Sequence, residues 1–296
     1  MDENEWLAQR FEEHRSHLRS MAYRMLGSLT EADDAVQDTW LRLSRAGASE
    51  VENLGGWLTT IIARVCLNML RSRHARREDS FGLHLPDPII SADEQRQPEE
   101  EALLADSVGL ALLVVLDTLS PDERLAFVLH DVFGTPFEEI APMVGRTPAA
   151  ARQLASRARR RVKSARPPMP DPDFARQRAV VDAFLAAARG GDFNALVNQL
   201  DPDVVLRGDV GQRRVAATSV FRGAEAVARQ ALLFARPDAR LRPVLVNGAV
   251  GVVAFVGAQP ISVMGFTVAA GKIVEIDAIA DPVRVRRLSA DVLTGE

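Results

Sequence analysis

The sequence lacks the features that mark secreted and membrane proteins. It has 296 residues but a single cysteine, Cys66, so neither an internal disulfide nor a multi-cysteine zinc site can form. No stretch approaches the ~18 consecutive apolar residues of a membrane span. The acidic start, Met1 to Glu5, has no basic segment followed by an apolar one, so we expect no signal peptide and a cytoplasmic location.

The chain also lacks a net positive charge, but its charges are segregated. Lys and Arg number 36 against 40 Asp and Glu, which gives a formal net charge of −4. Residues 79–105 hold one basic and seven acidic side chains, whereas residues 146–166 hold eight basic side chains and no acid. Such asymmetry matters more than the total charge, and the basic segment points to nucleic acid.

The first part of the chain, residues 5–78, is expected to be helical. Thr30, followed by Asp33 and Asp34, looks like an N-cap with acids in the first helical turn. A second long helix is expected after Gly55-Gly56, where apolar residues recur at helical spacing.

Two proline-rich segments indicate linkers. Residues 79–105 contain Pro86, Pro88 and Pro98 beside an acidic run, which is typical of an extended segment. Residues 167–172 contain four prolines and predict a semi-rigid spacer.

Between these linkers, residues 106–166 return to a helical pattern with readable caps. Ser120 to Glu123 is a capping box with proline at the first helical position, and Thr135 to Glu138 repeats it. A short helix ends before Gly145, and a longer one runs from Pro148 to about Ala165. Two helices joined by a glycine turn form a helix-turn-helix, whose second helix suits a major groove.

This second helix carries the strongest signal, in the segment Thr147 to Arg161. Arginine pairs with phosphate and reaches guanine through two hydrogen bonds, and Gln153 can pair with adenine. The small residues Ala149 to Ala151 allow the helix to sit deep in the groove. The alternative is a solvated basic helix end, favoured by the helix dipole, but the short preceding helix favours DNA.

Two weaker patterns precede it. Five arginines between Arg64 and Arg77, with Trp57 upstream, suit single-stranded or opened DNA through phosphate contact and base stacking; a core tryptophan with an exposed arginine face is the alternative. The helix from Asp33 to Leu43 has an acidic polar face, which is either solvated or bound by a protein partner.

After residue 172 the pattern changes to α+β. Helices are expected from Phe174 to Ala188 and from Gly223 to Ala235, and Asn247-Gly248 and Ala270-Gly271 are hairpin-turn signals. The runs that alternate as strands are Val204 to Leu206, Leu241 to Val246, Val250 to Val256, Ile261 to Val268 and Ile273 to Ile279. We therefore expect a curved antiparallel sheet with helices.

The tail offers little for catalysis. None of the five histidines lies in it, which leaves four acids as candidates: Asp209, Glu225, Glu275 and Asp277. A buried carboxylate with a raised pKa can act as an acid or base, but two ordinary face residues on a strand explain Glu275 and Asp277 as well. Phe255, Met264 and Phe266 line either a ligand pocket or the core. We expect no enzymatic activity, no cofactor and no metal, and leave a small-molecule ligand open.

Three motifs of the helical half resemble bacterial sigma factors of the extracytoplasmic-function class, in the family's order. The segment Gly27 to Arg42 resembles the core-polymerase-binding helix, and Gly56 to Arg64 resembles the helix that opens and reads the minus-ten promoter element. The helix-turn-helix of Phe137 to Arg161 is similar to the one that reads the minus-thirty-five element. The resemblance covers residues 5–166.

The resemblance implies a role for three sets of residues. Those at the polymerase core are Asp33, Asp34, Val36, Gln37, Trp40 and Leu41. Those at the minus-ten element are Trp57, Arg64, Asn68, Arg71 and Arg73. Those at the minus-thirty-five duplex are Thr147, Ala150, Arg152, Gln153, Ser156, Arg157 and Arg160.

The tail resembles the subgroup of these factors that carries a SnoaL-like domain, a cone-shaped α+β fold that regulates the factor. The linker Leu85-Pro86-Asp87-Pro88 is similar to the subgroup's Leu-Pro-Glu-Pro motif. Asp209-Val210-Gly211-Gln212-Arg213 matches an Asp-Gly-Gly-Gly-Arg loop in part, and Asp281-Pro282 begins the segment where Asn-Pro-Asp-Lys-Leu is usual. The resemblance implies regulation through Leu85, Pro86, Asp87, Pro88, Asp209, Arg213, Asp281 and Pro282.

These observations predict a multidomain protein: two all-α domains at 5–78 and 106–166, the second with the helix-turn-helix, and an α+β domain at 173–296. The expected function is that of an RNA polymerase sigma factor, whose partners are core polymerase and duplex and melted promoter DNA, with no membrane. A ligand-sensing helix-turn-helix regulator is the alternative; it would not need the polymerase-binding helix. A tail enzyme fused to a DNA-binding module is the third hypothesis.

Overall fold

The computed structural model describes residues 3–46, 53–77, 85–92, 110–165, 168, 170–211 and 218–290. The chain divides into two compact units. The first comprises Met1–Ser80, Pro98–Asp106 and Leu112–Arg166, and the second comprises Phe81–Gln97, Ser107–Ala111 and Pro167–Glu296. Both expected helical domains thus fall in the first unit, and the described linker residues 85–92 belong with the α+β part.

Three long helices open the first unit: α1 (Glu3–Leu26), α2 (Leu29–Ala46) and α3 (Leu54–Arg77). They pack through apolar faces that bury Phe11, Leu43 and Ile62. The N-cap prediction at Thr30 is wrong, because α2 begins at Leu29 and the amide of Ala32 already bonds to the carbonyl of Ser28.

The rest of the first unit holds short helices that lead to one long helix. They are α5 (Leu110–Asp117), α6 (Pro121–Phe127), the π-helical turn η1 (Val128–Val132), α7 (Phe137–Val144) and α8 (Pro148–Ala165). Gly145 ends α7 in the left-handed region at φ 67°, which glycine adopts without strain. The helix-turn-helix is therefore confirmed as α7, a glycine turn and α8.

One of the two predicted capping boxes is present. The Ser120 hydroxyl accepts a hydrogen bond from the amide of Glu123, whose carboxylate accepts one from the amide of Ser120, both at 3.3 Å. The second box is wrong, since the N-cap of α7 is Pro136 and no side chain caps it. At α8 the Thr147 hydroxyl does accept from the amide of Ala150, at 3.3 Å.

The second unit is built on a seven-stranded open sheet with the strand order β1-β4-β5-β6-β7-β2-β3. The strands are β1 (Ile90–Ala92), β2 (Leu200–Asp209), β3 (Thr218–Arg222), β4 (Ala239–Val246), β5 (Ala249–Val256), β6 (Gln259–Ala269) and β7 (Lys272–Ile279). The prediction of an antiparallel sheet is wrong in one place: β2 runs parallel to β7, because α9 (Phe174–Gly190) and α10 (Phe193–Gln199) deliver β2 to the far side of the later meander.

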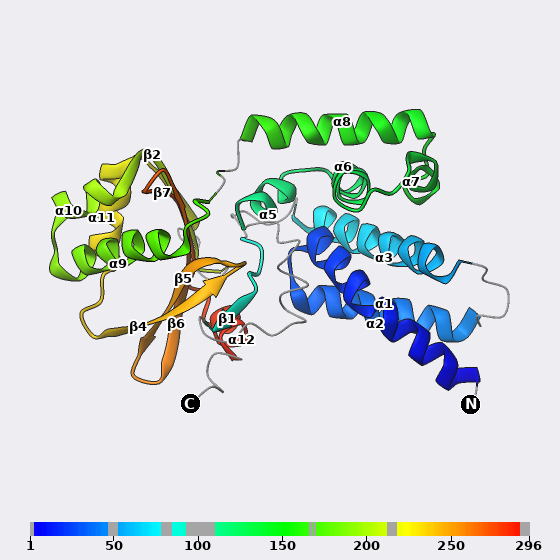
Figure 1. The fold of residues 1–296 in the computed structure, drawn as a ribbon, viewed down its shortest axis with the longest axis horizontal. Helices are drawn as coiled ribbons and strands as arrows, with labels where there is room; N and C mark the ends of the chain where they lie inside the picture. Colours follow the sequence, from blue (N-terminus) through cyan, green and yellow to red (C-terminus); the bar gives the residue numbers. More distant parts are fainter. Residues whose placement is uncertain are drawn as a thin grey trace. The chain divides into compact units, whose positions relative to one another are not determined.

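Helices α9, α10 and α11 (Ala224–Phe234) cover one face of this sheet (Figure 1), and their apolar side chains meet those of the strands in one core around Phe184 and Phe266. Register shifts within β5, β6 and β7 bend the sheet. The two predicted hairpin turns are confirmed: Asn247 and Ala270 both have positive φ, as does the glycine that follows each.

Gly251 on β5 provides a test of this packing. A Cβ atom there would lie 2.7 Å from the carbonyl oxygen of Met264 and would collide with Val246, so neither backbone nor core has room for it. Gly251→Ala should therefore lower the free energy of unfolding by about 1–3 kcal/mol, measured by urea denaturation. Gly190→Ala is the matched control, since a Cβ there meets nothing within 4 Å. Equal stability of the two variants would contradict the packing.

Candidate nucleic-acid interface and linker contact

Helix α8 separates small buried residues from long exposed ones. Ala151, Ala155 and Ala158 are fully buried and let the helix pack closely on α6 and α7. The opposite side is exposed, and four of its residues line one shallow concavity: Gln153, Ser156, Arg157 and Arg160. Of the predicted residues, Thr147 and Arg152 are also exposed and Ala150 is half-buried. The predicted minus-thirty-five set thus lies on α8 and the residue before it, with Gln153, Ser156, Arg157 and Arg160 on one face.

Several α8 arginines are oriented by an aromatic ring or an acid of a neighbouring helical segment. Arg152 lies over the ring of Phe137 at 5.2 Å, Arg159 binds Asp131 at 2.6 Å, and Arg161 binds Glu123 at 3.0 Å. In both ion pairs the arginine is more exposed than its acid, and Glu123 is buried. Their arginines remain within reach of an anionic ligand.

Helix α3 presents a second exposed face. Arg64, Asn68 and Arg71 are exposed at helical spacing, whereas Trp57 is half-buried. Arg71 binds Asp122 of α6 at 2.8 Å. This face contains three of the five predicted minus-ten residues.

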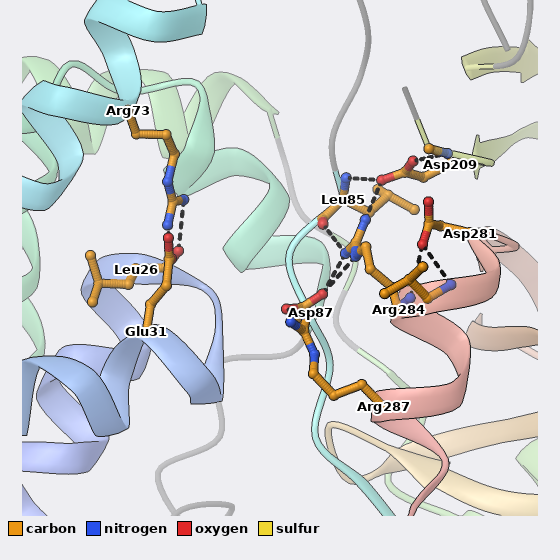
Figure 2. Close-up of polar contacts among 11 residues, drawn as sticks. Leu26, Glu31, Arg73, Leu85, Asp87, Asp209, Asp281, Arg284 and Arg287 are labelled. Carbon is orange, nitrogen blue, oxygen red and sulfur yellow. Dashed lines mark hydrogen bonds and ion pairs between the residues drawn. The ribbon is translucent and has the colours of Figure 1, made fainter. Parts of the chain in front are cut away.

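Arg73 lies apart from that face. Its side chain is only 18% exposed, donates to the carbonyl of Leu26 at 2.9 Å and forms an ion pair with Glu31 (Figure 2). It therefore joins the end of α1 and the start of α2 to α3, a positioning contact that its sequence pattern did not indicate. The side chains of Arg76 and Arg77 lie outside the described residues.

Helix α2 divides the predicted polymerase-binding set in two. Asp33, Asp34, Gln37 and Leu41 are exposed on one side, with Leu41 as a 42% exposed apolar residue among polar ones. Val36 is buried, and half-buried Trp40 packs on Phe11 with ring centroids 5.2 Å apart. The first group can touch a partner, while the second supports the helix from beneath.

The described linker residues are built into the second unit. Leu85 to Ser91 are all buried, although the sequence suggests an extended spacer. The amide of Ile89 donates to the Asn247 side chain at 2.6 Å, and β1 pairs antiparallel with β4, with Ile90 opposite Val246. The linker thus adds an edge strand to the sheet.

A mostly buried arginine joins this segment to the tail. Arg284 of α12 (Pro282–Leu288) donates to Asp87 at 2.6 Å, to Asp209 at 2.5 Å and to the carbonyl of Leu85 at 2.6 Å (Figure 2). Arg287 binds the other oxygen of Asp87 at 2.5 Å. We call these five residues the linker clamp; its two guanidinium groups balance its two carboxylates in charge.

The turn after β2 completes this arrangement. Asp281 caps α12 by accepting from the amides of Val283 and Arg284, and Pro282 occupies the first turn. Gly211 has φ 77°, a conformation that residues with a side chain rarely adopt, and a Cβ on it would lie 2.9 Å from Cγ of Asp281. Both the backbone conformation and the lack of space therefore favour glycine at this position. Of the predicted regulatory residues, Arg213 lies outside the described residues; the others, Pro86 and Pro88 included, are described, and Asp87 and Asp209 meet at Arg284.

A second buried cluster lies two residues before Asp209 on β2. Arg207 binds Glu275 at 2.6 Å and Asp277 at 3.0 Å, across the parallel pairing of β2 and β7. Burial raises the pKa of Asp277 to about 6, and the charge of Glu275 adds to the rise against the attraction of Arg207. Burial lowers the pKa of Arg207, but its two acids outweigh this and raise it. One guanidinium thus faces two carboxylates, and one of them retains a proton unusually well.

The described residues form neither a metal site nor a membrane-spanning helix. No group of three His, Cys, Asp or Glu side chains among them converges as a metal site would require. None of the helices described is long and apolar enough to cross a membrane.

Comparison with known proteins assigns both halves of the first unit. Residues 10–76 match the family Sigma-70 region 2, and residues 109–162 match Sigma-70, region 4. The chain is 41% identical over 221 residues to the ECF RNA polymerase sigma factor SigJ of Mycobacterium tuberculosis, covering 74% of this chain and 70% of that protein. The chain belongs to the ECF sigma factors of RNA polymerase.

Two further comparisons extend over the tail. The probable ECF sigma factor SigI of Mycobacterium tuberculosis is 34% identical over 283 residues, with 94% of each chain covered. The crystal structure of SigJ matches with a TM-score of 0.74 at 34% identity, covering 94% of this chain and 97% of that one. This sigma factor therefore shares its α+β tail with a solved relative, binds core polymerase and promoter DNA, and directs transcription initiation.

The basic partners of the acids in the tail were not predicted from the sequence. Arg207, Arg284 and Arg287 carry the two buried clusters, yet none of them was a candidate. No local pattern marks these arginines, because each of them binds an acid some 70 to 200 residues away in the sequence. Only the folded chain, through its strand register and loops, brings the two partners together.

The cluster at Arg207 makes stability depend on pH. Because the folded chain keeps a proton on Asp277 that the unfolded chain releases, the free energy of unfolding should fall as pH rises from about 4 to about 6. In Asp277→Asn the decrease in the free energy of unfolding between about pH 4 and about pH 6 should be smaller by about 1–3 kcal/mol. Urea denaturation at several pH values across this range measures it. Glu225→Gln, at an exposed pair with Arg229, is the control. Identical pH profiles for wild type and Asp277→Asn would contradict the assignment.

Proposed function

We propose that this sigma factor uses three separate faces during initiation. The exposed residues of α2 contact core polymerase, the Arg64 face of α3 contacts the melted minus-ten element, and α8 reads the minus-thirty-five duplex. The charge and exposure of these faces support the assignment: α8 and α3 present arginines, and α2 presents carboxylates with one apolar residue. The place of action is the cytoplasm, where core polymerase and DNA are found.

The proposed role of the tail is regulation through the linker clamp. The observation that carries it is Arg284, which is 11% exposed and binds linker residue Asp87 and tail residue Asp209 at once. The linker connects the two promoter-binding parts of the chain. Whether the tail holds or releases the linker therefore changes how far apart these two parts can move. The regulator is thus part of the chain itself.

We propose no catalytic role for the tail. The four acids that could serve are each engaged elsewhere. Asp209 belongs to the linker clamp, Glu275 and Asp277 share Arg207, and Glu225 forms an exposed pair with Arg229.

The test of the promoter-binding face uses run-off transcription with purified core on a cognate promoter. Arg160→Ala should weaken promoter binding by about 1–3 kcal/mol if the lost contact is bidentate to a base. Arg236→Ala, which removes an arginine from an exposed pair in the tail, should change nothing. Absence of core-dependent initiation by the wild-type chain from any genomic template would overturn the proposed function.

The test of the tail compares the full chain with a truncation after Arg166. Their transcription activities should differ, and Arg284→Ala should shift the full chain in the direction of the truncation, since it unties Asp87 from Asp209. Arg286→Ala is the matched control: it lies on the same helix, is exposed, and bonds only locally to the carbonyl of Pro282 among the contacts described. Equal activity of the full and truncated chains would remove the regulatory role.

A further inference from the structure

One arginine of α8 belongs to a stack of three flat side chains. The imidazole of His130 packs on the ring of Phe137, with ring centroids 3.9 Å apart and an angle of 28° between the two planes. The guanidinium of Arg152 lies over the ring of Phe137 as well, 5.2 Å from its centroid. Side chains of η1, α7 and α8 therefore meet in one stack, and the α8 member of it is exposed.

The other two members of this stack are fixed in place. Phe137 is buried at the start of α7, and Nδ1 of His130 donates to the carbonyl of Thr135 at 3.0 Å. The carboxylate of Glu138 lies 4.0 Å from the guanidinium of Arg152. A guanidinium is attracted to the face of an aromatic ring and is weakly hydrated, so it stays there at little cost. The orientation of Arg152 is therefore restricted, although its side chain is 61% exposed.

The other arginines of α8 differ from Arg152 in place or in partner. Arg159 and Arg161 form ion pairs with acids at 2.6 Å and 3.0 Å, and Arg157 and Arg160 lie further from the N-terminal end of the helix. Residues near that end of a recognition helix contact base edges. A guanidinium reads guanine through two parallel hydrogen bonds to O6 and N7, which require a fixed plane. Arg152 meets both conditions.

We propose that Arg152 reads a guanine of the minus-thirty-five element, and that Phe137, supported by His130, is the positioning residue that orients its guanidinium for this task. The proposal rests on the proposed role of α8. A long side chain loses rotamer freedom when it binds, and a ring that holds it beforehand reduces this cost. Guanine alone offers two acceptors side by side in the major groove. The stack therefore contributes to the choice of base as well as to affinity.

The experiment uses holoenzyme assembled from purified core and the full chain. The probe is a pool of duplexes of a cognate promoter in which the minus-thirty-five element is randomised, and the bound and unbound duplexes are sequenced. The measured quantity is the preference for guanine over the next-best base at each position of the element. The wild-type chain should show such a preference at one position at least, and its absence from every position would overturn the proposal.

The first pair of variants tests the base contact. Arg152→Lys keeps the charge but replaces the planar fork by a compact ammonium group, so the guanine preference at one position should fall about five- to hundredfold. Arg159→Lys is the matched control: it lies on the same helix and keeps its charge, but its partner is Asp131 rather than a ring. It should change no preference. An unchanged preference in Arg152→Lys, or the same loss in both variants, would overturn the assignment of Arg152.

The second set of variants tests the stack. Phe137→Leu removes the ring but leaves an apolar side chain in the core, so the guanine preference at the same position should fall about two- to tenfold. Phe137→Tyr keeps the ring and should retain most of that preference. His130→Ala removes the support and leaves Phe137 in place, so it decides the outcome if urea denaturation shows that Phe137→Leu does not fold.

Two results would overturn the positioning role: an unchanged guanine preference in the variant that decides, or a loss of binding that is equal for all bases. In each of these cases, core-dependent transcription by the wild-type chain would still uphold the proposed function.

Discussion

The attachment of the linker to the second unit depends on one mostly buried guanidinium, that of Arg284. Arg284 sits between Asp87 and Asp209, whose side chains are 7% and 2% exposed, and together with Arg287 it balances their charges. Burial makes such a network costly to form and more costly to leave incomplete, because each partner lost strands a buried charge. The described linker residues 85–92 are held against the sheet in part by the bonds of Arg284 to Leu85 and Asp87.

Arginine serves the molecule in two opposite ways. On α8 and α3 it is exposed, and its charge is offered to a polyanion. Arg24 and Arg124 are buried and Arg207 and Arg284 are mostly buried, and each joins segments distant in sequence. A planar group with five donors suits both uses, since it satisfies several acceptors in fixed geometry. The sequence alone therefore does not separate an exposed arginine such as Arg71 from a structural one such as Arg73.

Local patterns predicted the parts of the fold that local forces determine. The α7–α8 turn at Gly145, the Ser120 capping box and the two hairpins all follow from residues a few positions apart. The parallel pairing of β2 with β7 did not, because it depends on where α9 and α10 bring the chain. The same limit applies to the sites: the arginine face of α8 is visible in sequence, whereas Arg73 as a structural contact requires three helices to meet.

The edge of the sheet has a consequence for any state in which the linker leaves. Beyond the reach of β1, strand β4 carries Arg240, Arg242 and Pro243, residues that discourage another strand from pairing there. The part that β1 covers, Val244 to Val246, is apolar and has no such protection. If the linker leaves, the backbone of Val244 to Val246 loses its strand partner. A second copy of the chain can then pair with this unprotected edge, so the protein self-associates more readily until the linker or another partner covers the edge.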